Sequence, residues 1–598
     1  MRVNKYDVDE KNTKFSFKNY ARGLEYLKKY KWKLIGLFII DTIVMLAHLL
    51  ITKQIQYILD NAVGTTDYNV VTNAILIMLG LVAVHIGFDL LEKRKMLKIN
   101  QALVIDIKND LFEHIQKLPF EYFDTRPNGK IIVRVTEYAE SVADLITDKL
   151  FTTIFLILNM GLTLVFMITT NLELTGIVLL GIIILNIILG VTAKPKRNLR
   201  LNMNNKYSNY TAYRLESLRG MEISQAFNRQ SKNLEITENL LDDFTLARKK
   251  MLPLANTGWF SAQVIEYIVT TSISFLGAMF LYPNVSAGTI IAMGEYSGSF
   301  WRPIRELFKI IDDFIESITY LERILETMDE PIKIFDKEDA KDIEINGNIE
   351  FDNVTFSYLK DRTVLDKVNF KINKNEKIAL VGETGSGKST IANLMCRFYD
   401  IDNGEIKIDG VNLKDIKLQS LRSQITIMQQ ENYLFSISII DNLKYGNKKI
   451  TENEVIEACK NMGIDNWIKN FPDGYNTILK NNGSNLSDGE RQILCYARTI
   501  INNPKILILD EATSKMDTKT EKVLQELTKE MIKDKTLIII AHRLSTIVNC
   551  DKIIFLKDKK IAEVGNHDEL MNKKGDYYNL YMSQMVWWHS YTMIKVQN

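Results

Sequence analysis

A glycine-rich stretch at residues 382–390 has the spacing of a phosphate-binding loop. It consists of Gly382, Glu383, Thr384, Gly385, Ser386, Gly387, Lys388, Ser389 and Thr390. An apolar run precedes it and a helix-compatible run follows, in the strand, loop and helix order that such a loop requires. Its glycines allow backbone N–H groups to surround phosphate oxygens at a helix N-terminus, where the helix dipole favours an anion. We expect Lys388 to reach the terminal phosphates of ATP and the Ser389 hydroxyl to bind Mg²⁺; the alternative is a plain glycine turn.

Two acidic residues, Asp510 and Glu511, follow the apolar run at 505–509. Beside a phosphate-binding loop, Asp510 is expected to hold Mg²⁺ through the water shell of the site. Glu511 is expected to orient and polarise the water that attacks the terminal phosphate. The structural alternative is that the acidic pair only caps the next helix.

Two further side chains are candidates for contact with the nucleotide. His542 ends the apolar run at 538–541, and near a phosphate site it is expected to contact the γ-phosphate. Tyr358 lies shortly before the glycine-rich stretch, and its ring could stack on a purine. Taken alone, a histidine or a strand aromatic is more often a packing residue, so both alternatives stay open.

The elements that carry these motifs occupy only the second half of the chain, because the first half is dominated by apolar runs. Six segments are candidates for membrane-spanning helices, each of which needs about 20 apolar residues. They centre on residues 34–51, 70–91, 150–170, 172–193, 259–281 and 285–301. Glu295 and two serines interrupt the sixth segment.

The flanking charges predict the orientation of these spans. Basic residues cluster at 28–33, 93–95 and 194–200, whereas the connections on the opposite side contain no Lys or Arg. By the positive-inside rule, both termini are expected in the cytoplasm. The first thirty residues have no apolar core of a signal peptide, so insertion depends on the later segments.

Glu295 is the ionisable residue that stands out within the predicted spans. Charged groups are costly in lipid and normally face a cavity or another helix. Glu295 either lines a substrate pathway or makes a structural hydrogen bond between helices. As a pathway residue, its carboxylate would favour cationic or amphipathic substrates.

The pattern along the chain predicts a multidomain protein: an all-α transmembrane domain with six helices, followed by an α/β P-loop nucleotide-binding domain. The long connections at 92–144 and 194–256 are charged, amphipathic and poor in Gly and Pro, so helices are expected to continue into the cytosol. The expected parts are a transmembrane domain at 1–328, a linker at 329–346, the nucleotide-binding domain at 347–585 and a tail at 586–598.

Taken together, these motifs resemble those of the ATP-binding cassette (ABC) transporters, specifically exporter-type half-transporters. The resemblance covers nearly the whole chain, from about Tyr20 to Leu580. Tyr358 is similar to the aromatic residue that stacks on adenine, Gln430 to the Q-loop glutamine and His542 to the switch histidine. Residues 486–492 are similar to the family signature, and 514–517 to its D-loop.

The resemblance extends the set of expected site residues. It implies that Gln430 binds both ATP and Mg²⁺ and that Ser487 and Gly489 contact phosphate. It also implies that 120–129 is the first coupling helix and that 212–220 holds the second.

The signature departs from the usual Leu-Ser-Gly-Gly-Gln at two positions. Asp488 replaces a glycine and Glu490 replaces the glutamine, whereas Ser487 and Gly489 are kept. Upstream of these motifs, Asn481 and Gln429 stand where a glutamate and a proline are common. Both new carboxylates are expected to bring negative charge near a polyphosphate, where like charges repel.

The family architecture implies a dimer, in which the loop of one cassette faces the signature of the other. Because the altered signature would serve the ATP on the other cassette, a heterodimer with a second half-transporter is favoured over a homodimer. The expected function is ATP-driven export or flipping of a small molecule, lipid or peptide across the cytoplasmic membrane. The alternative is an ATP-gated or sensory ABC protein without net transport.

Composition limits the remaining possibilities. The net charge is only +2, so nucleic acid is not an expected partner. The four cysteines include no CxxC pair, which fits a reducing cytosolic compartment. A chain rich in Asn, Lys and Ile, with nine prolines, indicates a bacterial source. The substrate cannot be read from these patterns.

Overall fold

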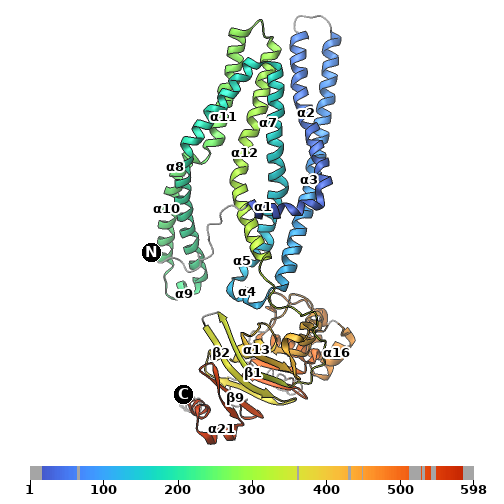
Figure 1. Ribbon diagram of the computed structural model, residues 1–598, viewed down its shortest axis with the longest axis vertical. Helices are drawn as coiled ribbons and strands as arrows, with labels where there is room; N and C mark the ends of the chain where they lie inside the picture. The colour runs from blue at the N-terminus through green and yellow to red at the C-terminus, as the bar shows by residue number, and fades with distance from the viewer. Residues whose placement is uncertain are drawn as a thin grey trace. The chain divides into compact units, whose positions relative to one another are not determined.

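The computed structural model describes residues 17–62, 68–359, 362–428, 433–447, 449–510, 527, 532–540 and 547–583. The chain divides into two compact units, one formed by Met1–Gln116 and Asn128–Glu330, the other by Lys117–Pro127 and Pro331–Asn598 (Figure 1). The first unit is helical and the second mixes helices with sheets. This confirms the predicted order of a helical transmembrane domain followed by an α/β domain.

Long helices dominate the first unit. Its helices are α1 Phe17–Leu24, α2 Lys31–Ala62, α3 Tyr68–Lys117, α5 Asn128–Val133, α6 Ala139–Asp144, α7 Leu150–Thr170, α8 Leu172–Arg219, α9 Met221–Ala226, α10 Gln230–Ala255, α11 Thr257–Leu276 and α12 Ala287–Met328. Helix α3 has 50 residues and α8 has 48, so each is more than twice the length that crosses a bilayer. The prediction that helices continue beyond the spans is therefore confirmed.

Five helical stretches of the described residues are long and apolar enough to cross a membrane, judged by length and composition. They are Asn19–Asn61, Val71–Lys117, Asn128–Thr170, Leu172–Arg219 and Gln230–Leu281. These stretches contain the first five predicted spans. The sixth predicted span lies at the start of α12, a continuous helix of 42 residues in which Glu295 and Arg302 interrupt the apolar sequence. Its place in the membrane stays a prediction.

The interior of the first unit is built around aromatic residues of α12. Tyr296 and Trp301 are fully buried and pack with residues of α8 and α11. Gly181 of α8 permits this contact, because a Cβ atom there would lie 2.8 Å from the Trp301 ring. Close packing by small residues is a common way for membrane helices to associate.

The second unit contains two sheets. In the antiparallel sheet, the strands lie in the order β2 (Arg362–Ile372), β1 (Ile349–Leu359), β4 (Asn403–Ile408) and β5 (Val411–Asn412). In the larger sheet, the order is β10 (Lys560–Gly565), β9 (Lys552–Lys557), β3 (Lys377–Gly382), β8 (Thr536–Ile540), β7 (Ile506–Asp510) and β6 (Ile425–Met428). Strands β9, β3, β8, β7 and β6 are parallel. Their carboxyl ends therefore meet at one edge, which is where ligands bind in open α/β sheets.

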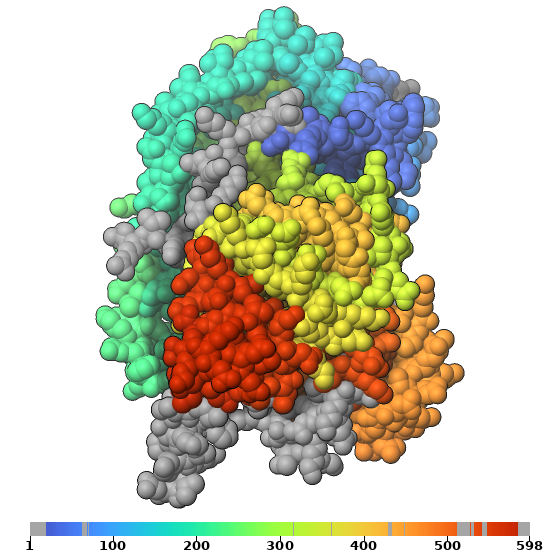
Figure 2. Space-filling view, turned by 60° about the horizontal axis from the view of Figure 1, so that its bottom comes forward, coloured from blue at the N-terminus to red at the C-terminus, as the bar shows by residue number. Residues whose placement is uncertain are grey.

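The helices that the structure describes after residue 331 fall into two groups. Close to the sheets are α13 Lys388–Met395, α14 Leu418–Gln424 and α21 His567–Lys573; a separate helical part contains α15 Ile439–Lys444, α16 Glu452–Asn461, α17 Asp465–Lys469 and α18 Asp488–Asn502. The helical part has its own hydrophobic cluster, which includes Leu443, Ile468 and Leu494. In Figure 2 the end of the chain with α21 (red) and the segment with α16 to α18 (orange) lie on opposite sides of this unit.

All four cysteines lie in the second unit, where they are buried and form no disulfide. Burial raises the pKa of the Cys396 thiol to about 12 and that of Cys459 to about 11. Burial also raises the pKa of Cys495. These thiols are protonated at neutral pH, so they behave as packing residues.

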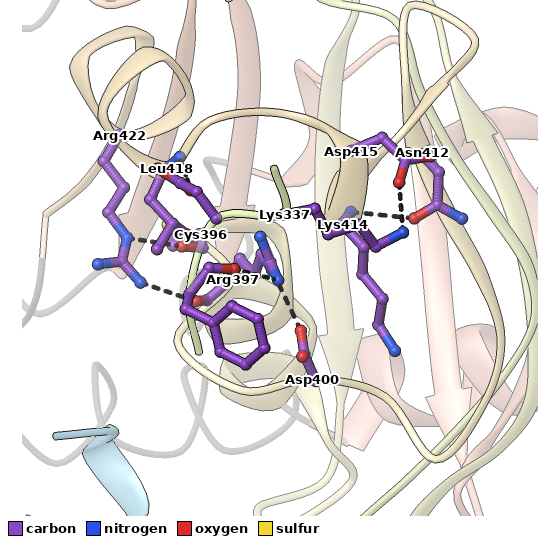
Figure 3. Close-up of polar contacts among 11 residues, drawn as sticks. Lys337, Cys396, Arg397, Asp400, Asn412, Lys414, Asp415, Leu418 and Arg422 are labelled. Atoms are coloured by element: carbon purple, nitrogen blue, oxygen red, sulfur yellow. Dashed lines mark hydrogen bonds and ion pairs between the residues drawn. The ribbon is translucent and has the colours of Figure 1, made fainter. Parts of the chain in front are cut away.

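The segment predicted as a linker is hydrogen-bonded to the second unit. The Arg397 guanidinium donates to the Phe335 carbonyl at 3.2 Å and to Asp400 at 3.1 Å. Lys337 pairs with Asp415 at 2.5 Å. Figure 3 shows Arg397 between Asp400 and Arg422, whose guanidinium donates to the Arg397 carbonyl at 2.8 Å. These bonds attach the chain to the nucleotide-binding domain shortly after it leaves α12.

Candidate nucleotide-binding site

The glycine-rich stretch forms a tight loop between β3 and α13, as predicted. Gly382, Gly385 and Gly387 have φ angles of +154°, +84° and +105°, which favour glycine. A Cβ atom at Gly382 would lie 2.3 Å from the Leu556 carbonyl oxygen, and one at Gly387 would lie 2.7 Å from Leu365. Side chains at these positions would therefore break the loop, whereas glycine leaves its backbone N–H groups accessible.

Lys388 opens α13 and is held inside the loop. Its Nζ donates to the carbonyl oxygens of Gly382 and Glu383, each at 2.8 Å, and the residue is 6% exposed. Burial lowers the pKa of Lys388, while the negative charge of Asp510 opposes this shift. The Ser386 hydroxyl is also buried and has no hydrogen-bond partner among the described residues. A buried cation and an unpaired donor in one loop fit the oxygens of a polyphosphate.

Two oxygen ligands for Mg²⁺ are available at the same sheet edge. Ser389 follows Lys388 and is exposed. Asp510 ends β7, and the parallel register of β3, β8 and β7 carries it to the edge where the loop begins. Hydroxyl and carboxylate oxygens are the ligands that Mg²⁺ prefers. The residues present therefore fit Mg²⁺ bound together with a nucleotide.

Tyr358 lies beside the loop at the end of β1. Its hydroxyl donates to the Thr390 hydroxyl at 3.2 Å, and its ring meets Tyr399 edge to face at 5.1 Å between centroids. The side chain is half-buried, so part of it stays accessible to a ligand. These contacts bring Tyr358 to the first turn of α13, and its stacking on a purine stays a prediction.

The comparison with known families decides what this site belongs to. Residues 34–304 match the ABC transporter transmembrane region and residues 365–514 match the ABC transporter family. The chain belongs to the ABC transporter family. It carries an ATP-binding domain with the ATPase activity of that family, and its apolar helices make it a multi-span protein of the cell membrane.

Relatives of this ABC transporter come from bacteria, and some of them are named as flippases or exporters. The chain is 33% identical to YknV of Bacillus subtilis, an uncharacterised ABC transporter ATP-binding protein, over 97% of each chain. It is 30% identical to an ATP-dependent lipid A-core flippase of Haemophilus influenzae, over 88% of this chain and 90% of the flippase. A solved bacterial Atm1-family ABC exporter superposes with a TM-score of 0.77 at 25% identity, covering 93% of this chain and 98% of that one.

The signature lies at the start of α18 in the helical part of the ATP-binding domain. Ser487 caps the helix: its hydroxyl accepts the Glu490 N–H at 3.3 Å, and the Glu490 carboxylate accepts the Ser487 N–H at 2.9 Å. The Ser487 hydroxyl also lies 3.0 Å from the same carboxylate. Gly489 is buried, and Asp488 forms an ion pair with Arg491. Both carboxylates that depart from the usual signature therefore have partners within their own helix.

The structure brings some of the predicted residues together and not others. The loop and Asp510 share one edge of the larger sheet, and Tyr358 of the antiparallel sheet reaches α13 beside the loop. By contrast, no hydrogen bond among the described residues links Ser487 to the loop. Gln430, Glu511 and His542 lie outside the described residues, as does the predicted D-loop at 514–517. Their roles stay predictions.

Within the predicted first coupling helix at 120–129, a short helix forms over Phe120–Thr125 and contacts the ATP-binding domain, while its coupling role stays a prediction. Helix α4 (Phe120–Thr125) belongs to the second unit, and the Phe120 ring lies 4.4 Å from that of Phe398. The hydroxyl of Tyr399 donates to Asp124. The predicted second coupling region, 212–220, forms the end of α8, and the separate short helix α9 (Met221–Ala226) follows it.

Some residues beside the loop were not predicted from the sequence. A cavity of about 480 Å³ borders Glu383 to Ser386 and is also lined by Lys557, Lys559 and Asp576. The two lysines lie in and beside the turn between β9 and β10, where Asp558 and Lys559 have positive φ angles of 49° and 70°. The only signal in the sequence was the polar group at 557–560 between two apolar runs. Tyr399 was likewise missed, although it directly follows Phe398 in an aromatic pair.

Glu295 lies on α12 with its side chain exposed. Among the described residues, neither a hydrogen bond nor an ion pair engages its carboxylate. By contrast, Glu266 of α11 forms an ion pair with Arg305 of α12. Within the part of the chain that the structure describes, Glu295 thus has no hydrogen bond between helices, and its role in a pathway stays a proposal.

Proposed function

We propose that this ABC transporter uses ATP hydrolysis to export or flip an amphipathic small molecule, lipid or peptide across the cytoplasmic membrane. The observation that carries the proposal is the pairing, in one chain, of long apolar helices with a loop in which Lys388 is buried and ready to bind polyphosphate. The flippase and multidrug export names of relatives support export as the direction.

Each residue of the site has a role in the proposed cycle. The glycine loop and Lys388 bind the phosphates, Tyr358 stacks on adenine, and Ser389, Asp510 and Gln430 hold Mg²⁺. Bound Mg²⁺ would neutralise charge on the phosphates as the terminal bond breaks. Glu511 orients the attacking water, and His542 contacts the γ-phosphate.

The functional unit is proposed to be a dimer, with both termini of each chain in the cytoplasm. Ser487 and Gly489 of this chain would contact ATP bound to the partner, because a signature and a phosphate loop from different chains complete each site in this family. Glu490 engages Ser487, and Asp488 pairs with Arg491. These contacts within the signature support a heterodimer, in which this altered signature serves a slower site. ATP favours the closed dimer, and hydrolysis releases it, so the membrane helices alternate between two states.

Reconstitution into lipid vesicles tests the proposal. The chain is incorporated alone and together with the product of a neighbouring gene, and ATP-dependent movement of fluorescent amphiphiles is measured. Wild-type vesicles are expected to move at least one amphiphile, and Glu511→Gln vesicles are expected to bind ATP but to move it on the order of a hundredfold more slowly. Hydrolysis without movement of any tested compound would instead favour an ATP-gated or sensory protein.

A further inference from the structure

Helix α12 carries a polar stripe on an exposed face. The polar stripe consists of Glu295, Ser299 and Arg302, which are spaced at i, i+4 and i+7 and so lie on one side of the helix. Glu295 and Arg302 are exposed in the single chain. Charged side chains are costly at the centre of a bilayer. In the predicted sixth span, the polar stripe is therefore expected to face water or protein rather than lipid.

Two histidines extend the polar stripe onto neighbouring helices. His48 of α2 lies with Nε2 3.3 Å from Ser299 Oγ, and the ring centroids of His48 and His85 are 5.8 Å apart. His85 of α3 is in turn 3.2 Å from the carbonyl oxygen of Val44. Three helices thus carry polar groups that lie near one another.

The two charges of the polar stripe remain separate. Glu295 and Arg302 are seven positions apart along the helix, which corresponds to a rise of about 10 Å. Neither side chain forms an ion pair with any described residue. Arg305, one turn further along, does have a partner of opposite charge. It forms an ion pair with Glu266, and the two side chains are only 19% and 13% exposed. Helix α12 therefore has a largely buried ion pair to α11, and an outward pair of opposite charges that is open to a ligand.

We propose that the polar stripe recognises the headgroup of a zwitterionic amphiphile, a molecule with one cationic group, one anionic group and an apolar chain. This inference rests on the proposed export function and specifies its substrate class. Glu295 binds the cationic group and Arg302 binds the anionic group, with hydrogen bonds from Ser299 or His48 between them. Ile291, one turn before Glu295, is 48% exposed and continues the surface for the apolar chain. A lone carboxylate would select cations. Because the guanidinium lies on the same face, a headgroup with both a cationic and an anionic group is favoured instead.

Binding measurements with three amphiphiles of equal chain length test the inference. The full chain, in uncharged maltoside micelles and without nucleotide, is titrated with an alkylphosphocholine, an alkyltrimethylammonium and an alkyl phosphate. The alkylphosphocholine is expected to bind most tightly. Glu295→Gln should weaken its binding about tenfold and leave the alkyl phosphate unaffected, and Arg302→Gln should weaken it about tenfold and leave the alkyltrimethylammonium unaffected. Lys309→Gln is the matched control, because Lys309 lies on α12 but pairs with Glu306 at 3.0 Å.

Several outcomes would overturn the inference. The three amphiphiles could bind with equal affinity, or both variants could lower the affinity for all three equally. Either result would show that the polar stripe does not distinguish the charges of the headgroup. If Glu295 instead pairs with Arg302 of a second copy, each single variant would lower the dimer fraction without changing selectivity, and the double variant Glu295→Arg with Arg302→Glu would restore the dimer. Vesicle transport separates this inference from the proposed function: transport without headgroup selectivity rejects only the inference, and selective binding without any transport rejects only export.

Discussion

At the scale of single residues, Glu490 changes the meaning of the altered signature. The pattern Ser487-x-x-Glu490 is a capping box, so Glu490 does more than add negative charge. The capping box accounts for an acidic residue here, since the carboxylate satisfies a backbone donor of α18. It also engages the Ser487 hydroxyl, which the partner's ATP is proposed to need.

Glu490→Gln is expected to raise ATP hydrolysis about fivefold at the slow site that this signature completes, in a dimer whose strong site is blocked by Glu511→Gln. Glutamine can still cap the helix, while a negative charge worth roughly 1 kcal/mol near a phosphate is removed. The steady-state ATPase rate of the purified dimer measures the effect. Glu454→Gln is the control, because Glu454 forms the same capping box with Thr451 at the start of α16. A rate that stays the same in both variants would mean that Glu490 does not disturb the composite site.

Lys388 gives a second prediction at this scale, through its pKa. Burial lowers the pKa of Lys388 from the ordinary value of 10.5, so the side chain loses its proton at a lower pH than an exposed lysine. ATP attracts the charged form, so nucleotide affinity is expected to fall as pH rises toward 10 and binding there is expected to take up a proton. Calorimetry in two buffers of different ionisation enthalpy measures that uptake. Lys388→Ala should bind ATP more weakly, without this uptake; a wild type with pH-independent affinity up to pH 10 would contradict the argument.

At the scale of elements, α4 is connected to the nucleotide site through aromatic residues. Phe120 stacks near Phe398, Asp124 accepts the Tyr399 hydroxyl, and Tyr399 packs edge to face on Tyr358. Tyr358 in turn bonds Thr390 in the first turn of α13. Burial, and then the bond to Asp124, raise the pKa of Tyr399, so its hydroxyl stays protonated and able to donate.

Tyr399→Phe is expected to uncouple the two halves of the molecule while leaving ATP binding nearly unchanged. The substitution keeps the ring contact with Tyr358 and removes only a partly exposed hydrogen bond, worth about 1 kcal/mol. Stimulation of ATPase activity by a transported amphiphile should therefore fall about fivefold, with the nucleotide Kd within twofold of wild type. Tyr475→Phe is the matched control, since the Tyr475 hydroxyl donates to Asp465 in the helical part at 3.0 Å. Equal stimulation in both variants would count against coupling through Tyr399.

The elements differ in how well the sequence predicted them. The loop at 382–390 and the apolar strand before it are local patterns, so their positions followed from spacing alone. The long helices α3 and α8 also followed, because their sequences contain few helix breakers; α8 continues through Pro195. Asp124 and Tyr399 are 275 residues apart in the chain, and no local pattern links them. The lysines of the β9–β10 turn could not be predicted for the same reason. They lie near the loop because β9 is the neighbour of β3 in the sheet, although the two strands are far apart in the sequence.

At the scale of the whole molecule, the question is whether the two chains of the working transporter are identical, and this depends on which phosphate-binding loop the signature faces. In this chain Lys388 lies inside the phosphate-binding loop and Asp510 lies at the same sheet edge. Its signature has two acidic substitutions. A homodimer would carry two equal sites, both with the altered signature. A heterodimer would contain one strong site and one slow site.

The chain purified alone is expected to hydrolyse ATP at least tenfold more slowly than the same chain purified with its genomic neighbour. Glu511→Gln in this chain should then abolish most ATP turnover by the two chains together, because the phosphate-binding loop and Glu511 of this chain form the strong site. Turnover numbers for the lone chain, the pair and the paired variant give the result. Vigorous hydrolysis and transport by the lone chain would contradict the heterodimer.

The buried cysteines make these measurements practical. Maleimides and disulfide reagents react with thiolates, and the raised pKa values of Cys396 and Cys459 leave almost none at pH 7. In the native protein, Ellman's reagent is expected to modify fewer than one of the four cysteines within minutes, and all four after denaturation. A new cysteine on an exposed residue would then react alone, in an otherwise natural sequence. Pairs of spin labels attached in this way would report distances between the two chains at each step of the ATP cycle.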